Sequence, residues 1–407
     1  MSNQTQDIQS KLSWKKVLIP VVLGVGVSVY LLYSALQQPY YTEATEQDFT
    51  HIWQDSNSNN IVDFSDAQEF LPLFKGQEIP KVVYKEVSAA TMIREFEWTN
   101  SALMALVFAL LMLVLRDFFY MVRLRILTHK KLNWKASFQV IMLWEFASAL
   151  TPSVVGGSSL AIFILNREGL SVGRSTATVM VTALMDELFY ILTVPVVIVL
   201  VGMDHLFPDS AAFTILGVNS IKGVFLVGYI FILLLTAGIM IALFLYPRAA
   251  KKAILALFRL PILRRWRSSA SQWGDELIMS SKELRNEPRS YWLKAFGATL
   301  LSWSARYFTL NFIFLAFTGG FDHLLVYGRQ LVMWVILLIS PTPGSSGVAE
   351  LAFTEFFSYL LSPAFLAIAA VLWRLLTYMP YLAAGSMVLP AWLRRTGKSR
   401  KKAQTPA

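Results

Sequence analysis

The stretch Pro341-Thr-Pro-Gly-Ser-Ser-Gly347 interrupts an apolar segment that would otherwise be long enough to cross a bilayer. A transmembrane helix needs about 20 apolar residues, and the apolar runs on either side, 324–339 and 348–361, are each too short. Proline removes a backbone donor, and glycine permits dihedral angles that a helix excludes. The stretch therefore predicts a re-entrant hairpin of two half-helices with its break inside the membrane.

A second stretch, Thr151-Pro-Ser-Val-Val-Gly-Gly157, divides the apolar segment 136–165 in the same way. Each break is preceded by one full-length apolar segment and followed by another, and these three parts form one unit. The chain of the first unit starts on the outer side of the membrane, and that of the second unit starts on the inner side. This pattern predicts an inverted-topology repeat, a plan common among transporters. The two halves are expected at about 98–202 and 294–392.

The composition around these breaks is that of an integral membrane protein. Of the 407 residues, 55% are hydrophobic and only 15% are charged, against about 25% in soluble domains. This excludes a soluble enzyme, and the aromatic content excludes a disordered chain. The absence of cysteine excludes disulfides and thiolate metal sites. The predicted fold class is all-α, a polytopic helical membrane protein with about six full spans plus the two hairpins.

Charge sets the expected topology, because basic loops stay in the cytoplasm. Basic residues cluster at both termini and within 247–294, whereas acidic side chains outnumber basic ones in 37–97. We therefore expect a multi-pass protein of the cell membrane (the bacterial inner membrane), with both termini cytoplasmic. The basic residues lie beside apolar segments and suit lipid headgroups rather than nucleic acid. The predicted full spans are 17–36, 99–122, 176–201, 224–246, 295–317 and 365–389.

These spans imply a division of the chain into four parts. The division is an N-terminal anchor helix at 1–36, an acidic extracytoplasmic segment at 37–97, a transmembrane domain at 98–392 with its basic loop at 247–294, and a basic tail at 393–407. The loop is expected to form amphipathic helices on the membrane surface.

Several charged residues fall inside the predicted membrane segments, where they are costly and mark functional sites by default. Arg374 and Arg306 are suited to neutralising a lipid phosphate, and Arg374 occupies the repeat position that Asp186 and Glu187 hold in the other half. We expect Arg374 to face that acidic pair. Asp186, Glu187 and Glu350 are the candidates to pair with the two arginines or to carry protons, with structural ion pairing between helices as the alternative. The half-helices that begin near Ser158 and Ser346 would offer free N–H groups to an anion.

The candidate substrate-binding residues combine these charges with the breaks and with the residues that follow Arg374. They are Arg116, Glu145, Pro152, Gly156, Gly157, Asp186, Glu187, Arg306, Pro341, Pro343, Gly344, Gly347, Glu350, Arg374, Tyr378 and Pro380. No nucleotide-binding GxxxxGK[ST] loop and no nucleophile with a base at readable spacing occur in the sequence. No catalytic residue is therefore assigned, and no cofactor is expected beyond the ion considered next.

One stretch of the acidic segment approximates a calcium-binding loop. Oxygen-bearing side chains stand at loop positions 1, 3, 5, 9 and 12. The pattern departs from the usual one by Asn60 in place of Gly and an Asp in place of the final Glu, so an ordinary polar loop is the alternative. The candidate ligands are Asp55, Asn57, Asn59, Asp63 and Asp66.

Four motifs together resemble the flippase-like transmembrane domain of the lysylphosphatidylglycerol synthase family over about residues 98–392. They are WEFASALTPSVVGG at 144–157, NREG at 166–169, PTPGSSGVAE at 341–350 and RLLTYMP at 374–380. The resemblance implies movement of lipids between leaflets, with a separate lipid-modifying enzyme as a partner. The synthase activity is not expected, because only a short tail follows the last span.

Three functions fit these features. The first is a flippase that moves an anionic or modified phospholipid or a lipid-linked headgroup, without its own ATPase. The second is a membrane-bound transferase or accessory subunit acting on polyprenyl-phosphate-linked sugars, the substrates linked to other stand-alone relatives, with Glu350 or Asp186 as acid or base. The third is a scaffold that holds a separate enzyme through the basic loop 247–294.

Overall fold

The computed structural model describes most of the chain from residue 82 onward and parts of what precedes it. The described residues are 26, 29–30, 33, 39–44, 50–54, 70–72, 82–151, 153–208, 221–259, 267–338, 342 and 345–404. Most of the predicted anchor lies outside them. So do all five candidate calcium ligands (Asp55, Asn57, Asn59, Asp63 and Asp66) and the candidate site residues Pro152, Pro341, Pro343 and Gly344.

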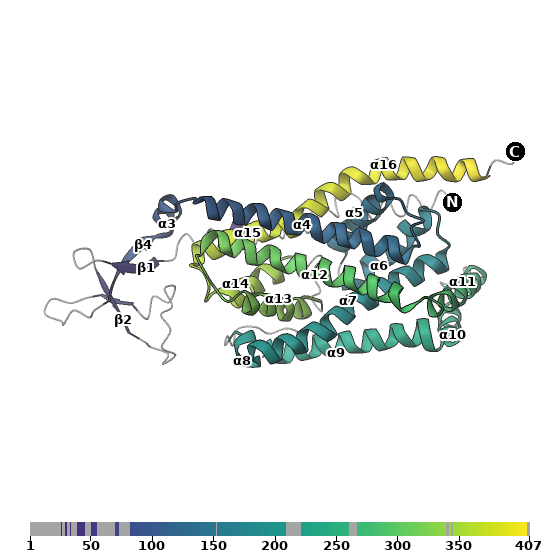
Figure 1. The fold of residues 1–407 in the computed structure, drawn as a ribbon, viewed down its shortest axis with the longest axis horizontal. Helices are drawn as coiled ribbons and strands as arrows, with labels where there is room; N and C mark the ends of the chain where they lie inside the picture. The colour runs from purple at the N-terminus through teal and green to yellow at the C-terminus, as the bar shows by residue number, and fades with distance from the viewer. Residues whose placement is uncertain are drawn as a thin grey trace.

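The described chain forms an elongated helical bundle with a small sheet at one end (Figure 1). Within the described residues, five helical segments are long and apolar enough to cross a membrane: Asn100–Leu127, Val172–Val201, Ile221–Leu245, Arg289–Phe317 and Pro363–Thr396. The prediction of a polytopic helical membrane protein is confirmed. The helices are α3 (Ala89–Glu95), α4 (Asn100–Leu127), α5 (Trp134–Leu150), α6 (Ser153–Arg167), α7 (Val172–Val201), α8 (Met203–Leu206), α9 (Ile221–Met240) with its π-helical extension η1 (Ile241–Leu245), α10 (Pro247–Leu257), α11 (Arg267–Arg285), α12 (Arg289–Phe317), α13 (His323–Leu338), α14 (Val348–Phe357), α15 (Pro363–Thr377) and α16 (Met379–Gln404).

Local chemistry sets where several of these helices begin. The side chains of Thr99, Asn133, Ser171 and Ser362 each accept a hydrogen bond from a backbone N–H in the first turn of α4, α5, α7 and α15. Such caps satisfy donors that a helix start otherwise leaves free. In the bundle, α4 packs most extensively against α12. The outer face of α4 exposes large apolar side chains such as Val107, Leu110 and Val114, as expected where lipid replaces water.

Both predicted breaks separate pairs of short helices. The first lies between α5 and α6, and the second lies between α13 and α14. The second half-helix begins at Val348, close to the expected Ser346, whereas the first begins at Ser153, five residues before the expected Ser158. In the second break, Gly347 has φ +87°, a left-handed conformation that glycine adopts without a steric penalty.

The last predicted span is not one continuous helix. At Tyr378 the backbone leaves helical geometry, with φ −130° and ψ −54°, and α15 gives way to α16. Pro380 is the second residue of α16, a first-turn position where the missing N–H of proline costs little. Beyond the membrane segment, α16 continues to Gln404, so the expected boundary near residue 393 falls inside a helix.

A four-stranded antiparallel sheet lies within the predicted extracytoplasmic segment and was not foreseen from the sequence. Its strands are β1 (Pro39–Ala44), β2 (His51–Trp53), β3 (Phe70–Pro72) and β4 (Val83–Ser88), in the order β1-β4-β2-β3. Its small core contains Tyr41 stacked on Phe70, with ring centroids 4.2 Å apart, and Tyr84 edge-on to Phe70. The sheet joins the bundle through α3, which leads into α4 (Figure 1).

Candidate functional site

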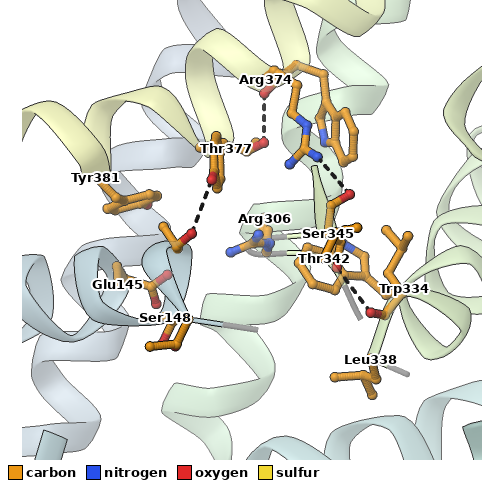
Figure 2. Close-up of a pocket in the computed structure, with 15 residues that line it drawn as sticks. Glu145, Ser148, Arg306, Trp334, Leu338, Thr342, Ser345, Arg374, Thr377 and Tyr381 are labelled. Atoms are coloured by element: carbon orange, nitrogen blue, oxygen red, sulfur yellow. Dashed lines mark hydrogen bonds between the residues drawn. The ribbon is translucent and has the colours of Figure 1, made fainter. Parts of the chain in front are cut away.

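A cavity with several charged and hydroxyl-bearing side chains in its wall lies at the centre of the bundle, beside both breaks. It consists of two adjoining pockets of about 170 and 220 Å³. The first contains residues from both breaks, Thr151 and Ser345 among them, and the second lies between α4, α5, α7 and α12. Figure 2 shows the guanidinium group of Arg306 pointing into the middle of the first pocket. The residues common to both pockets are Glu145, Ser148, Arg306, Trp334 and Leu338.

Arg374 and Glu350 form a buried ion pair at the second break. The Arg374 Nε donates to Glu350 Oε1 at 2.8 Å, and Nη2 donates to Oε2 at 3.2 Å. Glu350 also accepts from the backbone N–H of Gly347 at 2.7 Å, and Arg374 donates to the carbonyl of Ser345 at 3.4 Å. The pair therefore fixes the break on both sides.

Of the three carboxylates expected as partners, Glu350 pairs with Arg374, whereas the expected pairing across the repeat with Asp186 or Glu187 is wrong. Glu350 stands in the first turn of α14, where its carboxylate reaches both the helix N-terminus and Arg374. Glu350 therefore neutralises the charge of Arg374 within the same half of the bundle. Of the two predicted uses of Arg374, the ion pair is the one seen, although the residue still lines the first pocket.

Tyr378 connects the two breaks to the discontinuity in the last span. Its hydroxyl donates to the carbonyl of Ala149 at the end of α5, at 3.2 Å. The same hydroxyl accepts from Ser346 Oγ in the second break, at 3.4 Å. Both Tyr378 and Ser346 are buried. The hydroxyl of Tyr378 therefore links the end of α5 to the second break through two hydrogen bonds. Pro380, predicted beside it, lines neither of the two pockets.

A second arginine pair, between Arg123 and Asp186, lies on the wall of the second pocket. The Arg123 guanidinium donates from Nη1 to Asp186 Oδ1 and from Nη2 to Oδ2, and Nη1 also donates to Thr299 Oγ1 at 3.1 Å. Asp186 accepts a further hydrogen bond from Trp303 Nε1 at 2.7 Å. The sequence alone does not single out Arg123 as a site residue, because it stands among the basic residues that follow the apolar segment 99–122. Its spacing of seven residues from Arg116, two helical turns, was the available signal.

Arg116 belongs to a third polar cluster, which joins α4 to α5 and α16. It donates to Asp117 at 2.6 Å, to Glu145 at 2.5 Å and to the hydroxyl of Tyr381 at 3.0 Å. Tyr381 in turn donates to Asp117 at 3.0 Å. The charge of Arg116 is thus offset by two carboxylates, and we infer that the cluster holds the helices together.

Arg306 differs from these three arginines. Among the residues that the structure describes, no carboxylate forms an ion pair with it, and its buried Nε has no hydrogen-bond partner. The guanidinium lies over the ring of Trp334 at 4.4 Å and near Trp303 at 5.6 Å. Stacking on an aromatic face fixes the plane of the guanidinium and leaves its edge available for an anion. Among the described arginines that line the cavity, Arg306 is the one that no carboxylate neutralises.

The glycines of the first break have a packing role. A side chain at Gly157 would collide with Ser148, so the absence of a side chain lets α6 approach α5 closely. Gly156 stands one residue before it in α6. The structure thus places Gly157 against the wall residue Ser148 rather than in the cavity lining. Gly347 serves the second break through its backbone, as described above.

Comparison with known proteins places this cavity within a family. Residues 82–385 match the model of the lysylphosphatidylglycerol synthase TM region. The chain is 24% identical over 324 residues to a UPF0104 membrane protein of Archaeoglobus fulgidus, covering 74% of this chain and 93% of that protein. No solved structure matches the chain. The family match spans well over half of the chain and includes both breaks and every described residue of the cavity, so the protein belongs to the lysylphosphatidylglycerol synthase transmembrane-region family.

Proposed function

We propose that the protein moves an anionic phospholipid or a lipid-linked anionic headgroup between the two leaflets, without an ATPase of its own. The observation that carries this proposal is Arg306, an arginine inside the bundle that lines both pockets and has no described carboxylate partner. A cation at this depth is costly unless an anion accompanies it. A lipid phosphate is the anion that a membrane supplies.

The surroundings of Arg306 suit a phosphate headgroup. A guanidinium binds phosphate oxygens through two parallel hydrogen bonds, and such charge-assisted bonds are strong where water is scarce. The hydroxyl-bearing residues Ser148, Thr151, Thr342 and Tyr378 line the first pocket around it. The acyl chains would remain in the bilayer while the headgroup occupies the cavity. The chemistry of the site therefore fits a headgroup better than a fully apolar ligand.

The arrangement of the helices supports alternating access to the cavity. Each half consists of a long helix, two short helices separated by a break, and a further membrane-crossing segment. The short pair α5 and α6 lies toward the end that carries α10 and α11, whereas α13 and α14 lie toward the sheet (Figure 1). Two re-entrant hairpins entering from opposite sides form an inverted repeat, whose halves rock about a central site.

The distribution of charge orients this arrangement in the membrane. The end with α10 and α11 carries the basic loop, and positive charge stays in the cytoplasm. Both termini would then be cytoplasmic and the sheet extracytoplasmic, in a bacterial inner membrane. Headgroups would enter the cavity from one side and leave from the other, driven by their own gradient or by an ion.

Arg306→Gln is expected to lower lipid movement by about 10- to 100-fold. The substitution keeps the polar shape but removes the charge, and a hydrogen bond to a charged group contributes about 1.5–3 kcal/mol, where each 1.4 kcal/mol is about tenfold. The measurement uses the full chain reconstituted in vesicles of phosphatidylcholine with phosphatidylglycerol that contain a trace of fluorescent phosphatidylglycerol. Bleaching of the label in the outer leaflet reports its movement.

The matched control is Arg289→Gln, the same substitution at the exposed first residue of the same helix. It should transport at the unchanged rate. Equal rates for the two variants would remove Arg306 as the headgroup site. Appearance of a lipid of new mass in the same vesicles, after addition of a polyprenyl-phosphate sugar, would instead indicate a transferase.

A further inference from the structure

Glu187 is a buried carboxyl group that none of the ion pairs described above includes. It stands at the middle of α7, next to Asp186, and its side chain lines the second pocket. The residue is 4% exposed, and its Oε2 atom has no hydrogen-bond partner among the described residues. Glu187 is therefore unlike Asp186, Glu145 and Glu350, each of which accepts hydrogen bonds from an arginine.

Among the arginines that line the second pocket with Glu187, only one has no described carboxylate partner. Arg123 is held by Asp186, and Arg116 is held by Asp117 and Glu145, so Arg306 is the arginine of the pocket without a carboxylate. On α11, Glu276 and Glu283 contact the beginning of α7, at Gly173 and Arg174. The titratable and charged residues that line the pocket with Glu187 are Arg116, Tyr120, Arg123, Glu145, Asp186, Tyr190 and Arg306.

Glu187 and Arg306 thus line one pocket, and neither forms an ion pair with another of the described residues. An unpaired buried carboxylate is unfavourable, so the neutral, protonated form is preferred while Arg306 is engaged elsewhere. In the proposed cycle, a deprotonated Glu187 offsets the charge of Arg306 across the second pocket when no headgroup is bound. This arrangement differs from the one described here, in which the two groups form no ion pair. A phosphate that binds Arg306 would displace that carboxylate, which would then take up a proton.

We propose that Glu187 binds one proton as an anionic headgroup binds Arg306 and releases it as the headgroup leaves, so that lipid movement is coupled to a proton gradient. This inference rests on the proposed function. One negative charge on the headgroup and one proton travel in the same direction, and no covalent bond changes. The coupling makes the step electroneutral, which removes the cost of carrying a net charge through the bundle.

The test imposes a pH gradient on the vesicles described above, which also enclose a pH-sensitive dye. For the unchanged protein, the initial rate of movement of fluorescent phosphatidylglycerol should change by up to about tenfold per pH unit, as for a single titrating group. Proton flux reported by the dye should accompany the lipid. Glu187→Gln should show a rate, whatever its size, that does not change with pH, and no accompanying proton flux. Glu187→Asp should restore both responses in part.

The control is Glu97→Gln, which alters an exposed carboxylate between α3 and α4 and should keep both responses. A second readout needs no transport: the infrared difference spectrum between acid and alkaline pH should contain a protonated carboxyl band that Glu187→Gln lacks. A band that persists in Glu187→Gln, or transport that is independent of pH in the unchanged protein, would overturn the coupling alone. Absence of any lipid movement in the unchanged protein would overturn the proposed function and the coupling together.

Discussion

Arg374→Met is expected to lower the free energy of unfolding by about 3–5 kcal/mol, because it leaves Glu350 as a buried carboxylate without its cation. Glu350 is 1% exposed, and Arg374 supplies two of its three hydrogen bonds at the second break. Uptake of a proton by Glu350 would relieve part of that loss. The midpoint of thermal unfolding in detergent, compared with that of the unchanged protein, measures the effect.

The double variant Arg374→Met/Glu350→Gln separates the ion pair from simple loss of packing. It removes both charges, so it should be more stable than Arg374→Met alone. Arg289→Met, at the exposed start of α12, serves as the matched control and should change stability little. If Arg374→Met unfolded at the same temperature as this control, the ion pair between Arg374 and Glu350 would not stabilise the second break.

Asp186→Asn is expected to be similarly destabilising, by about 3–5 kcal/mol, because it leaves Arg123 as an unpaired buried cation. Arg123 is 2% exposed, and it cannot lose its charge by deprotonation as a lysine would. Asp186 also accepts from Trp303, so the substitution disturbs the link between α7 and α12. The effect is measured as the loss of folded protein on heating in detergent.

A comparison with the ion pair between Arg174 and Glu283 tests whether burial of the Arg123–Asp186 pair causes the loss of stability. Glu283 has 62% of its side chain exposed, and exposed pairs contribute about 0–1 kcal/mol. Glu283→Gln should therefore leave the unfolding midpoint almost unchanged. Equal losses for Asp186→Asn and Glu283→Gln would contradict the account of Arg123 as a cation that depends on its partner.

The two breaks were predictable from sequence because their cause is local. Proline and glycine disrupt a helix wherever they stand, so the stretches at 151–157 and 341–347 coincide with the breaks between two pairs of short helices. The break at Tyr378 has no glycine beside it, and Pro380 alone is compatible with a continuous first turn of a helix. Tertiary contacts of Tyr378 with the end of α5 and with Ser346 accompany this break, and sequence does not show such contacts.

The pairing of charges was less predictable, because it depends on which side chains the fold brings together. Most of the charges predicted inside the membrane take part in ion pairs, but repeat symmetry placed Asp186 and Glu187 opposite Arg374, whereas Glu350, the third candidate, is its partner. Arg123 was assigned to topology because it lies at the end of an apolar run. The sheet escaped prediction for a related reason: its strands are short, and β1 pairs with β4 across about forty residues of polar chain.

The central claim is that the cavity between the breaks holds a lipid phosphate at Arg306. The most direct test is an electron cryomicroscopy structure of the full chain in nanodiscs of phosphatidylcholine with phosphatidylglycerol. The account predicts headgroup density in the cavity, with a phosphate within ion-pair distance of the Arg306 guanidinium beside Trp334. Lipid density confined to the outer surface of the bundle, with Arg306 paired to a carboxylate of the protein, would contradict it.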